Sequence, residues 1–132
     1  MASPIFFQET HLLTDEARNQ IKPLIKTYKE VRDEMYKGFV YPIGEEPTNS
    51  SWSGFQNTIP DAESGYITLF RERLNQENIS SIQLKFMKNR KIELEDLMTG
   101  ETKTTQVDED GWSAFTIDQA GDYRFYKYTI ID

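Results

Sequence analysis

Apolar residues near the N-terminus recur at helical spacing. From Ala17 onward they follow one another in steps of four and three, which places them on one stripe of a helix. Thr14, which two acidic residues follow, is typical of a helix N-cap, and Gly38 is typical of a helix end. These signals predict a helix over residues 15–37, with a bend or a fresh start at Pro23, because proline lacks the N–H of the helical hydrogen bond. The stripe consists of Ala17, Ile21, Leu24, Tyr28, Val31 and Met35, with Ile25 widening it.

Beyond Gly38 the pattern changes to the alternation of apolar and polar residues that strands show, with frequent breaks at Gly, Pro, Asn and Ser. Residues 65–71 carry apolar side chains on both faces, which predicts a central strand. In residues 82–86, Ile82, Leu84 and Phe86 are expected to face the core. The strands expected from this pattern are residues 53–58, 65–71, 82–86, 92–97, 102–107, 112–117 and 123–131.

Turn residues connect the later strands. Thr99 and Gly100 stand between two of them, and Asp110 and Gly111 offer the positive φ of a second hairpin. The pattern therefore predicts a meander, and the close spacing of short strands favours a sandwich. We expect a mainly β fold, an antiparallel β-sandwich of about seven to eight strands preceded by one long amphipathic α-helix.

The change of period at Gly38 also divides the chain. We expect an N-terminal helical segment over residues 1–37 and a C-terminal β-sandwich domain over residues 38–132. The helix is longer than a small sandwich needs, and the apolar residues 4–7 add more surface ahead of it. We therefore expect its stripe to dock on a surface that this chain does not contain; the alternative is that the helix covers one face of its own sandwich.

Charge and composition remove several classes of function. Fifteen basic and twenty-two acidic residues give a net charge of -7, which repels phosphate backbones. No apolar run approaches the ~20 residues of a membrane-spanning helix. We therefore expect neither a nucleic-acid nor a membrane partner. The chain has no cysteine and only one histidine, His11, so no metal site and no cofactor are expected.

Residues with candidate chemistry are few. Asp108 to Gly111 superficially resemble a calcium loop, but the first and last ligand positions fall on Gln106 and Ile117, so a turn is the better interpretation. Carboxylates in polar loops offer a pair for glycoside chemistry, although solvated acids are the ordinary state of such loops. No catalytic residue is predicted, and we expect the isolated chain to be inactive. The loop carboxylates are Glu45, Glu46, Asp61 and Glu63.

Aromatic side chains are the candidates for binding carbohydrate. Pyranose rings pack on flat aromatic faces much as other apolar groups do. Trp52, Phe55 and Trp112 are therefore the candidate carbohydrate-binding residues. The competing interpretation is that these rings fill the core of the sandwich, since a chain of this size has few other large side chains.

Residues 41–47 (YPIGEEP), 51–56 (SWSGFQ) and 65–72 (GYITLFRE) form a pattern of aromatic and turn residues. This pattern resembles the C-terminal part of α-galactosidase-like glycoside hydrolases, and residues 94–100 (LEDLMTG) and 120–123 (AGDY) look like the later strands of the same part. The resemblance implies that residues 15–37 correspond to the last helix of a (β/α)8 barrel, and that an antiparallel β-sandwich follows. The family's catalytic carboxylates lie on barrel strands, so none is carried over to this chain.

The resemblance and the stripe together predict a non-catalytic C-terminal β-sandwich module of an α-galactosidase-like glycoside hydrolase. Its partner would be the catalytic (β/α)8 barrel of the same parent chain, which it would stabilise while helping to shape substrate access. Two alternatives stay open. One is a carbohydrate-binding module that uses exposed aromatics, and the other is a homodimer in which the helix stripes of two copies pair.

Overall fold

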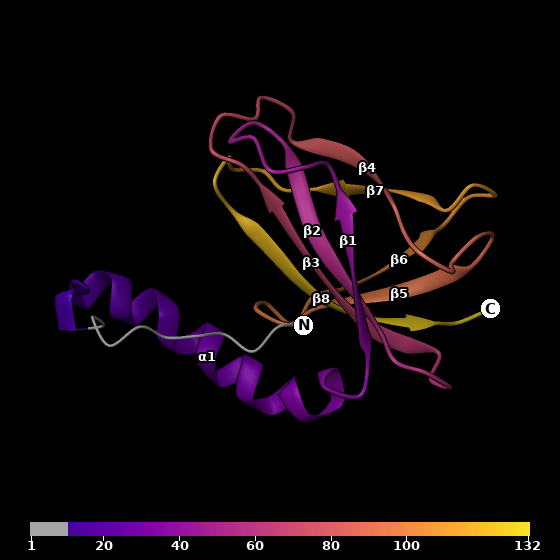
Figure 1. The fold of residues 1–132 in the computed structure, drawn as a ribbon, viewed down its shortest axis with the longest axis horizontal. Coiled ribbons are helices and arrows are strands. Elements are labelled where there is room, and N and C mark those ends of the chain that lie inside the picture. The colour runs from indigo at the N-terminus through magenta and orange to yellow at the C-terminus, as the bar shows by residue number, and fades with distance from the viewer. Residues whose placement is uncertain (1–10) are drawn as a thin grey trace.

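The computed structural model describes residues 11–132, which form one helix and eight antiparallel strands (Figure 1). These elements confirm the predicted fold class, an antiparallel β-sandwich preceded by a helix. The apolar residues 4–7, which were expected to enlarge the helix surface, lie outside the described residues. In chain order the elements are α1 (Asp15–Met35), β1 (Phe39–Gly44), β2 (Trp52–Thr58), β3 (Ser64–Arg71), β4 (Ile79–Gln83), β5 (Lys91–Asp96), β6 (Thr102–Gln106), β7 (Trp112–Thr116) and β8 (Tyr123–Ile130).

The strands form a large sheet in the order β1-β2-β3-β8-β5-β6 and a small sheet of β4 and β7. The predicted central position of β3 is confirmed, and the Thr99–Gly100 turn joins β5 to β6 as expected. The prediction of a second hairpin at Asp110 and Gly111 is wrong, because β6 and β7 belong to different sheets. Val107 still bonds to Arg90 beside β5, and Asp108 then accepts the N–H groups of Asp110 and Trp112, so this turn carries the chain across to the small sheet.

The main core lies between the two sheets. Alternate residues of β3, β5 and β8 point from the large sheet toward β4 and β7, as the period of two requires. We call this side of the large sheet the inner face and the opposite side the outer face. The side chains buried in the main core include Ile67, Leu69, Ile82, Leu84, Ile92, Leu94, Phe115, Ile117 and Tyr128.

The strand expected at residues 82–86 lies earlier in the chain, at Ile79–Gln83. Ile82 and Leu84 are buried as predicted, but Phe86 is 73% exposed with a φ of 63°, so its predicted place in the core is wrong. The physical reason is the buried side chain of Gln56. Its amide oxygen accepts the Lys85 N–H at 2.8 Å, and its amide nitrogen donates to the Lys85 carbonyl at 3.0 Å. The side chain of Gln56 therefore makes the two backbone hydrogen bonds at Lys85 that a neighbouring strand would otherwise make.

β1 was not among the expected strands, because Pro42 interrupts its pattern. The structure pairs β1 with β2 alone and leaves it at one edge of the large sheet. Proline is compatible with such an edge, where the missing N–H faces away from the neighbouring strand. The proline therefore hid β1 from the sequence pattern, although the edge of the sheet can accommodate it.

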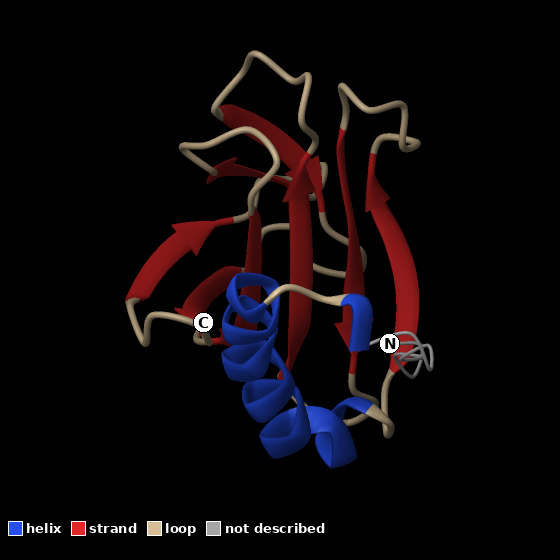
Figure 2. Cartoon of the chain, turned by 90° about the vertical axis from the view of Figure 1, so that its left-hand side faces the viewer, coloured by secondary structure: helices blue, strands red, loops and turns tan. Residues whose placement is uncertain are grey.

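α1 begins as predicted and ends two residues early. The Thr14 hydroxyl accepts the Ala17 N–H at 3.2 Å, and the helix ends at Met35 instead of residue 37. Pro23 lies inside one unbroken helix, so the chain does not restart there. Figures 1 and 2 show α1 on the outer face of the large sheet, with its C-terminal end beside the strands and its N-terminal half extending away from them.

Candidate functional site

The apolar stripe of α1 is only partly covered by the sandwich. Met35 is fully buried in a second cluster on the outer face, together with Tyr66 and Phe125. Leu24, Tyr28 and Val31 pack against this cluster from the helix. The remaining stripe residues, Ala17, Ile21 and Ile25, belong to neither core cluster of residues 11–132. The sheet therefore accounts for the C-terminal half of the stripe and leaves the N-terminal half without a core of its own.

Polar contacts fix the C-terminal end of α1 to the sheet. The Asn57 side-chain amide donates to the Met35 carbonyl at 2.9 Å. The Tyr66 hydroxyl donates to the Glu34 carboxylate, and Lys127 Nζ lies 2.9 Å from Glu34 Oε2. A Cβ at Gly38 would collide with the Asn57 amide, so a glycine is needed where the chain leaves the helix. These contacts anchor the last turn of α1 to the sheet.

The contacts of Glu34 also change its titration. The hydrogen bond from Tyr66, followed by the bond and charge of Lys127, lowers the pKa of Glu34 below its ordinary value. Burial and the nearby carboxylate raise the pKa of Tyr66 well above its ordinary value. Both shifts favour the same state, in which an ionised Glu34 accepts a hydrogen bond from the Tyr66 hydroxyl and pairs with Lys127.

The outer face continues beyond the helix with exposed apolar side chains. Phe55 is 45% exposed, and Val40 is also exposed on the neighbouring strand β1. Cross-strand register places Thr68 between Phe55 and the buried Phe125, so this surface adjoins the cluster under α1. We give the name docking surface to the exposed Val40 and Phe55 together with the half-buried helix residues Ala17, Ile21 and Ile25.

The three candidate carbohydrate-binding residues lie in three different places. Trp52 is 2% exposed, and its indole N–H donates to the Glu77 carbonyl at 3.0 Å, so a sugar has no access to this ring. Phe55 belongs to the docking surface, and Trp112 is 43% exposed at the start of β7 in the small sheet. The structure therefore does not join the three into one platform. The odd spacing of Trp52 and Phe55 along one strand was the sequence signal that they face opposite sides.

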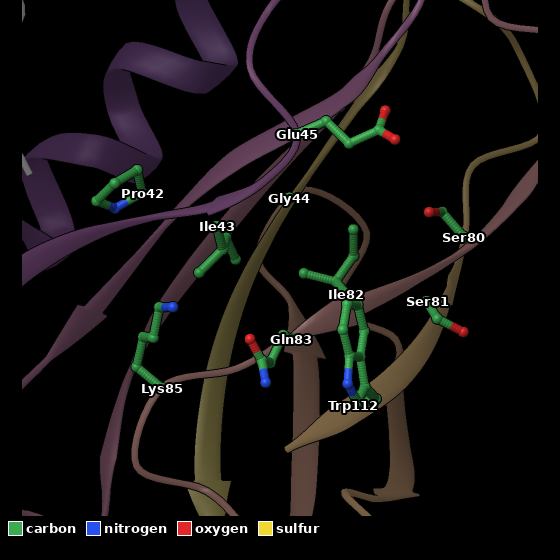
Figure 3. Close-up of a pocket in the computed structure, with 10 residues that line it drawn as sticks. All are labelled: Pro42, Ile43, Gly44, Glu45, Ser80, Ser81, Ile82, Gln83, Lys85 and Trp112. Carbon is green, nitrogen blue, oxygen red and sulfur yellow. The ribbon is translucent and has the colours of Figure 1, made fainter. Parts of the chain in front are cut away.

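A pocket of about 210 Å³ lies between β1 and β4, as Figure 3 shows. β1 is an edge of the large sheet, and β4 pairs only with β7, so the pocket fills the gap between two strand edges. Sequence reasoning missed most of its lining, because β1 and β4 are far apart in the chain and no motif links them. The lining residues are Pro42, Ile43, Gly44, Glu45, Ser80, Ser81, Ile82, Gln83, Lys85 and Trp112.

The loop carboxylates considered for glycoside chemistry lie in different surroundings. Glu45 lines the pocket, whereas Glu63 pairs with Arg90 at 3.5 Å. Across residues 11–132, no group of three or more His, Asp or Glu side chains is placed to hold a metal ion. Within the same described part of the chain, no helix has both the length and the apolar character that crossing a membrane requires.

Neither the protein-family models, nor the curated proteins, nor the solved structures compared with this chain match it.

Proposed function

We propose that the chain is a non-catalytic β-sandwich module that docks on the catalytic (β/α)8 barrel of an α-galactosidase-like glycoside hydrolase. The observation that carries this proposal is the divided stripe of α1. Its C-terminal half is fixed to the sheet, while Ala17, Ile21 and Ile25 extend beyond both cores of the described residues. The segments that resemble the family suggest a (β/α)8 barrel as the partner, and we place its binding site on the docking surface.

The docking surface suits a large partner better than a small ligand. Stable protein interfaces bury roughly 800 Å² on each side, which requires a broad surface of this kind. Helix and sheet both contribute apolar side chains to it, the helix through its N-terminal half and the sheet through β1 and β2. Glu34, Asn57 and Lys127 hold the C-terminal end of α1 in place, which lowers the ordering cost of binding at that end.

A barrel is also a better partner than a second copy of this chain. Each copy carries a net charge of -7, so two copies repel one another before their stripes meet. The homodimer therefore depends on burying enough apolar area to offset this repulsion. A barrel of the same parent chain is tethered, and tethering raises its effective concentration at the docking surface.

Extending the reading frame upstream of residue 1 tests the proposal directly. The longer product is expected to contain a run of alternating strands and helices, and to hydrolyse aryl α-galactosides that the 132-residue chain leaves intact. In that product, Phe55→Asp places a charge in the interface. We expect it to lower the melting temperature of the enzyme, because an unpaired charge is costly to bury.

The matched control is Ile79→Asp, which places the same charge on an exposed residue of the small sheet. It is expected to leave both the melting temperature and the hydrolysis rate close to those of the unmodified product. Hydrolysis by the 132-residue chain alone would refute the non-catalytic assignment. Equal melting temperatures for the two variants would refute docking through this surface.

A further inference from the structure

The pocket between β1 and β4 is independent of the docking surface. Its volume of about 210 Å³ is below the range of roughly 300–1,000 Å³ that drug-sized ligands occupy, so it accommodates about one ring of a ligand. Ile43 and Ile82 supply buried apolar side chains, and polar groups from both strands surround them. Figure 3 shows Glu45 and Lys85 on opposite sides of Ile43.

The polar lining matches a neutral ligand with several hydroxyl groups. Ser81 provides a hydroxyl, which is both a donor and an acceptor, and the amide of Gln83 provides both functions as well. Gln83 pairs with Trp112 across the strands, so Ser81, Gln83 and Trp112 share one face of the small sheet, whereas Ser80 points to the other face. The Gln83 amide nitrogen already donates to the Asp110 carbonyl at 3.0 Å, which orients its oxygen as the free acceptor. One acid, Glu45, and one base, Lys85, balance each other. The lining therefore carries no net charge with which to select an anion or a cation.

One exposed aromatic ring lines the pocket, and a second follows a lining residue in the chain. Trp112 lines it directly and is 43% exposed. Phe86 directly follows the lining residue Lys85 and is 73% exposed, and its ring packs edge-to-face on Tyr41 at a centroid distance of 5.3 Å. Phe86 also has a φ of 63°, a backbone conformation that is strained for a bulky residue. Strained backbone positions of this kind cluster at functional sites.

The same strands are poorly suited to the other ligand that a strand edge attracts, an extended peptide. Such a peptide binds by alternating backbone hydrogen bonds along the edge. Pro42 stands within β1 and has no N–H to donate, and Gly44 at the end of β1 has a φ of 77°, outside the extended region. The edge of β1 is therefore interrupted where the pocket lies.

We propose that the pocket between β1 and β4 binds one ring of a neutral oligosaccharide, which stacks on Trp112 while Ser81 and Gln83 bond its hydroxyls. The adjoining ring of the sugar chain extends toward Phe86. This binding site requires no barrel and uses none of the residues of the docking surface. It thus goes beyond the proposed function and stands or fails separately from it.

The two tryptophans of the chain make the test specific, because their indole N–H groups give two separate signals in a proton–nitrogen correlation spectrum. The labelled chain is titrated with lactose, melibiose, maltose and cellobiose, and with a strand-forming peptide in a parallel arm. We expect at least one disaccharide to shift the Trp112 signal saturably at millimolar concentrations. The signal of Trp52, which is buried, is expected to stay in place.

Variants assign the binding to the pocket. Trp112→Ala, followed by the backbone signal of its strand partner Gln83, is expected to weaken binding about tenfold. Ser81→Leu, which fills the pocket and keeps the indole as reporter, is expected to abolish binding. The control Phe70→Ala removes an exposed ring from the large sheet and is expected to leave affinity unchanged. Unshifted Trp112 signals with all four sugars, equal affinities in all variants, or saturable binding of the peptide alone would each overturn the proposal.

Discussion

The two faces of the large sheet are covered to different degrees. The inner face lies under β4 and β7, and Leu69 and Leu94 on this side have no exposed surface. Among the described residues, α1 alone lies over the outer face, where it buries Tyr66 and Phe125 but leaves Phe55 exposed. Apolar side chains therefore occupy both faces, but within residues 11–132 the outer-face core is a small cluster under the C-terminal half of α1, whereas the inner-face core extends across the strands. The comparison separates residues that maintain the fold from residues that we propose bind a partner.

The largest effect is expected on the inner face. Leu94→Ala removes a fully buried side chain between the sheets and leaves a cavity, so we expect the free energy of unfolding to fall by about 2–5 kcal/mol. Urea denaturation of the purified chain measures this loss. The matched control is Ile79→Ala in the small sheet, where an exposed side chain should change stability by about 0.5 kcal/mol or less. Equal losses in the two variants would contradict the assignment of Leu94 to a closed core between the sheets.

A smaller effect, with a defined pH dependence, is expected where α1 meets the outer face. The pKa of Glu34 is lower in the folded chain than its ordinary value of 4.5, so the folded state favours the ionised form. This contribution to stability is complete above the ordinary pKa and is lost as the pH falls through the folded value. Glu34→Gln removes the group, so the variant should be less stable than the unmodified chain at neutral pH, and this difference should narrow below pH 4.5.

The measurement is the free energy of unfolding from urea titrations across the acid range. Glu30→Gln supplies the control, because it makes the same change at an exposed position of the same helix. Its stability difference from the unmodified chain is expected to be smaller at neutral pH and to vary less with pH. If the two glutamine variants show the same pH profile, Glu34 does not fix the helix to the sheet in the way that its contacts with Tyr66 and Lys127 indicate.

These contrasts also show what the sequence could predict. The stripe of α1 and the two-faced pattern of β3 were readable, because each depends on the period of one segment. The exposed position of Phe86 could not be predicted, because it depends on Gln56. This residue lies in β2, and its side chain bonds the backbone of Lys85 just beyond the end of β4. Local turn residues at Gly111 predicted a hairpin, although the choice of sheet depends on contacts across the core. The period of a segment therefore predicts whether it forms a helix or a strand, whereas the strands with which it pairs are decided by the whole fold.

The candidate sites show the same limit. Trp52 and Trp112 are chemically alike in the sequence, but one is a buried donor to the Glu77 carbonyl and the other lines an open pocket. The pocket itself exists only because two strand edges, β1 and β4, are brought together. No spacing within either strand carries that information. A binding site made of two edges therefore becomes visible only with the topology.

The smallest effect is expected for the exposed part of the outer face, and it completes the comparison. Phe55→Ala removes an aromatic ring as large as many in the core, yet the ring is 45% exposed and lies outside both clusters of the described residues. In the isolated chain we expect the free energy of unfolding to change by about 0.5 kcal/mol or less, measured by the same urea titration. Phe115→Ala, which removes the same ring from the main core, is the control and should cost about 3–5 kcal/mol. A loss at Phe55 that approaches the loss at Phe115 would mean that the outer face already closes a core, and that no partner is needed to cover it.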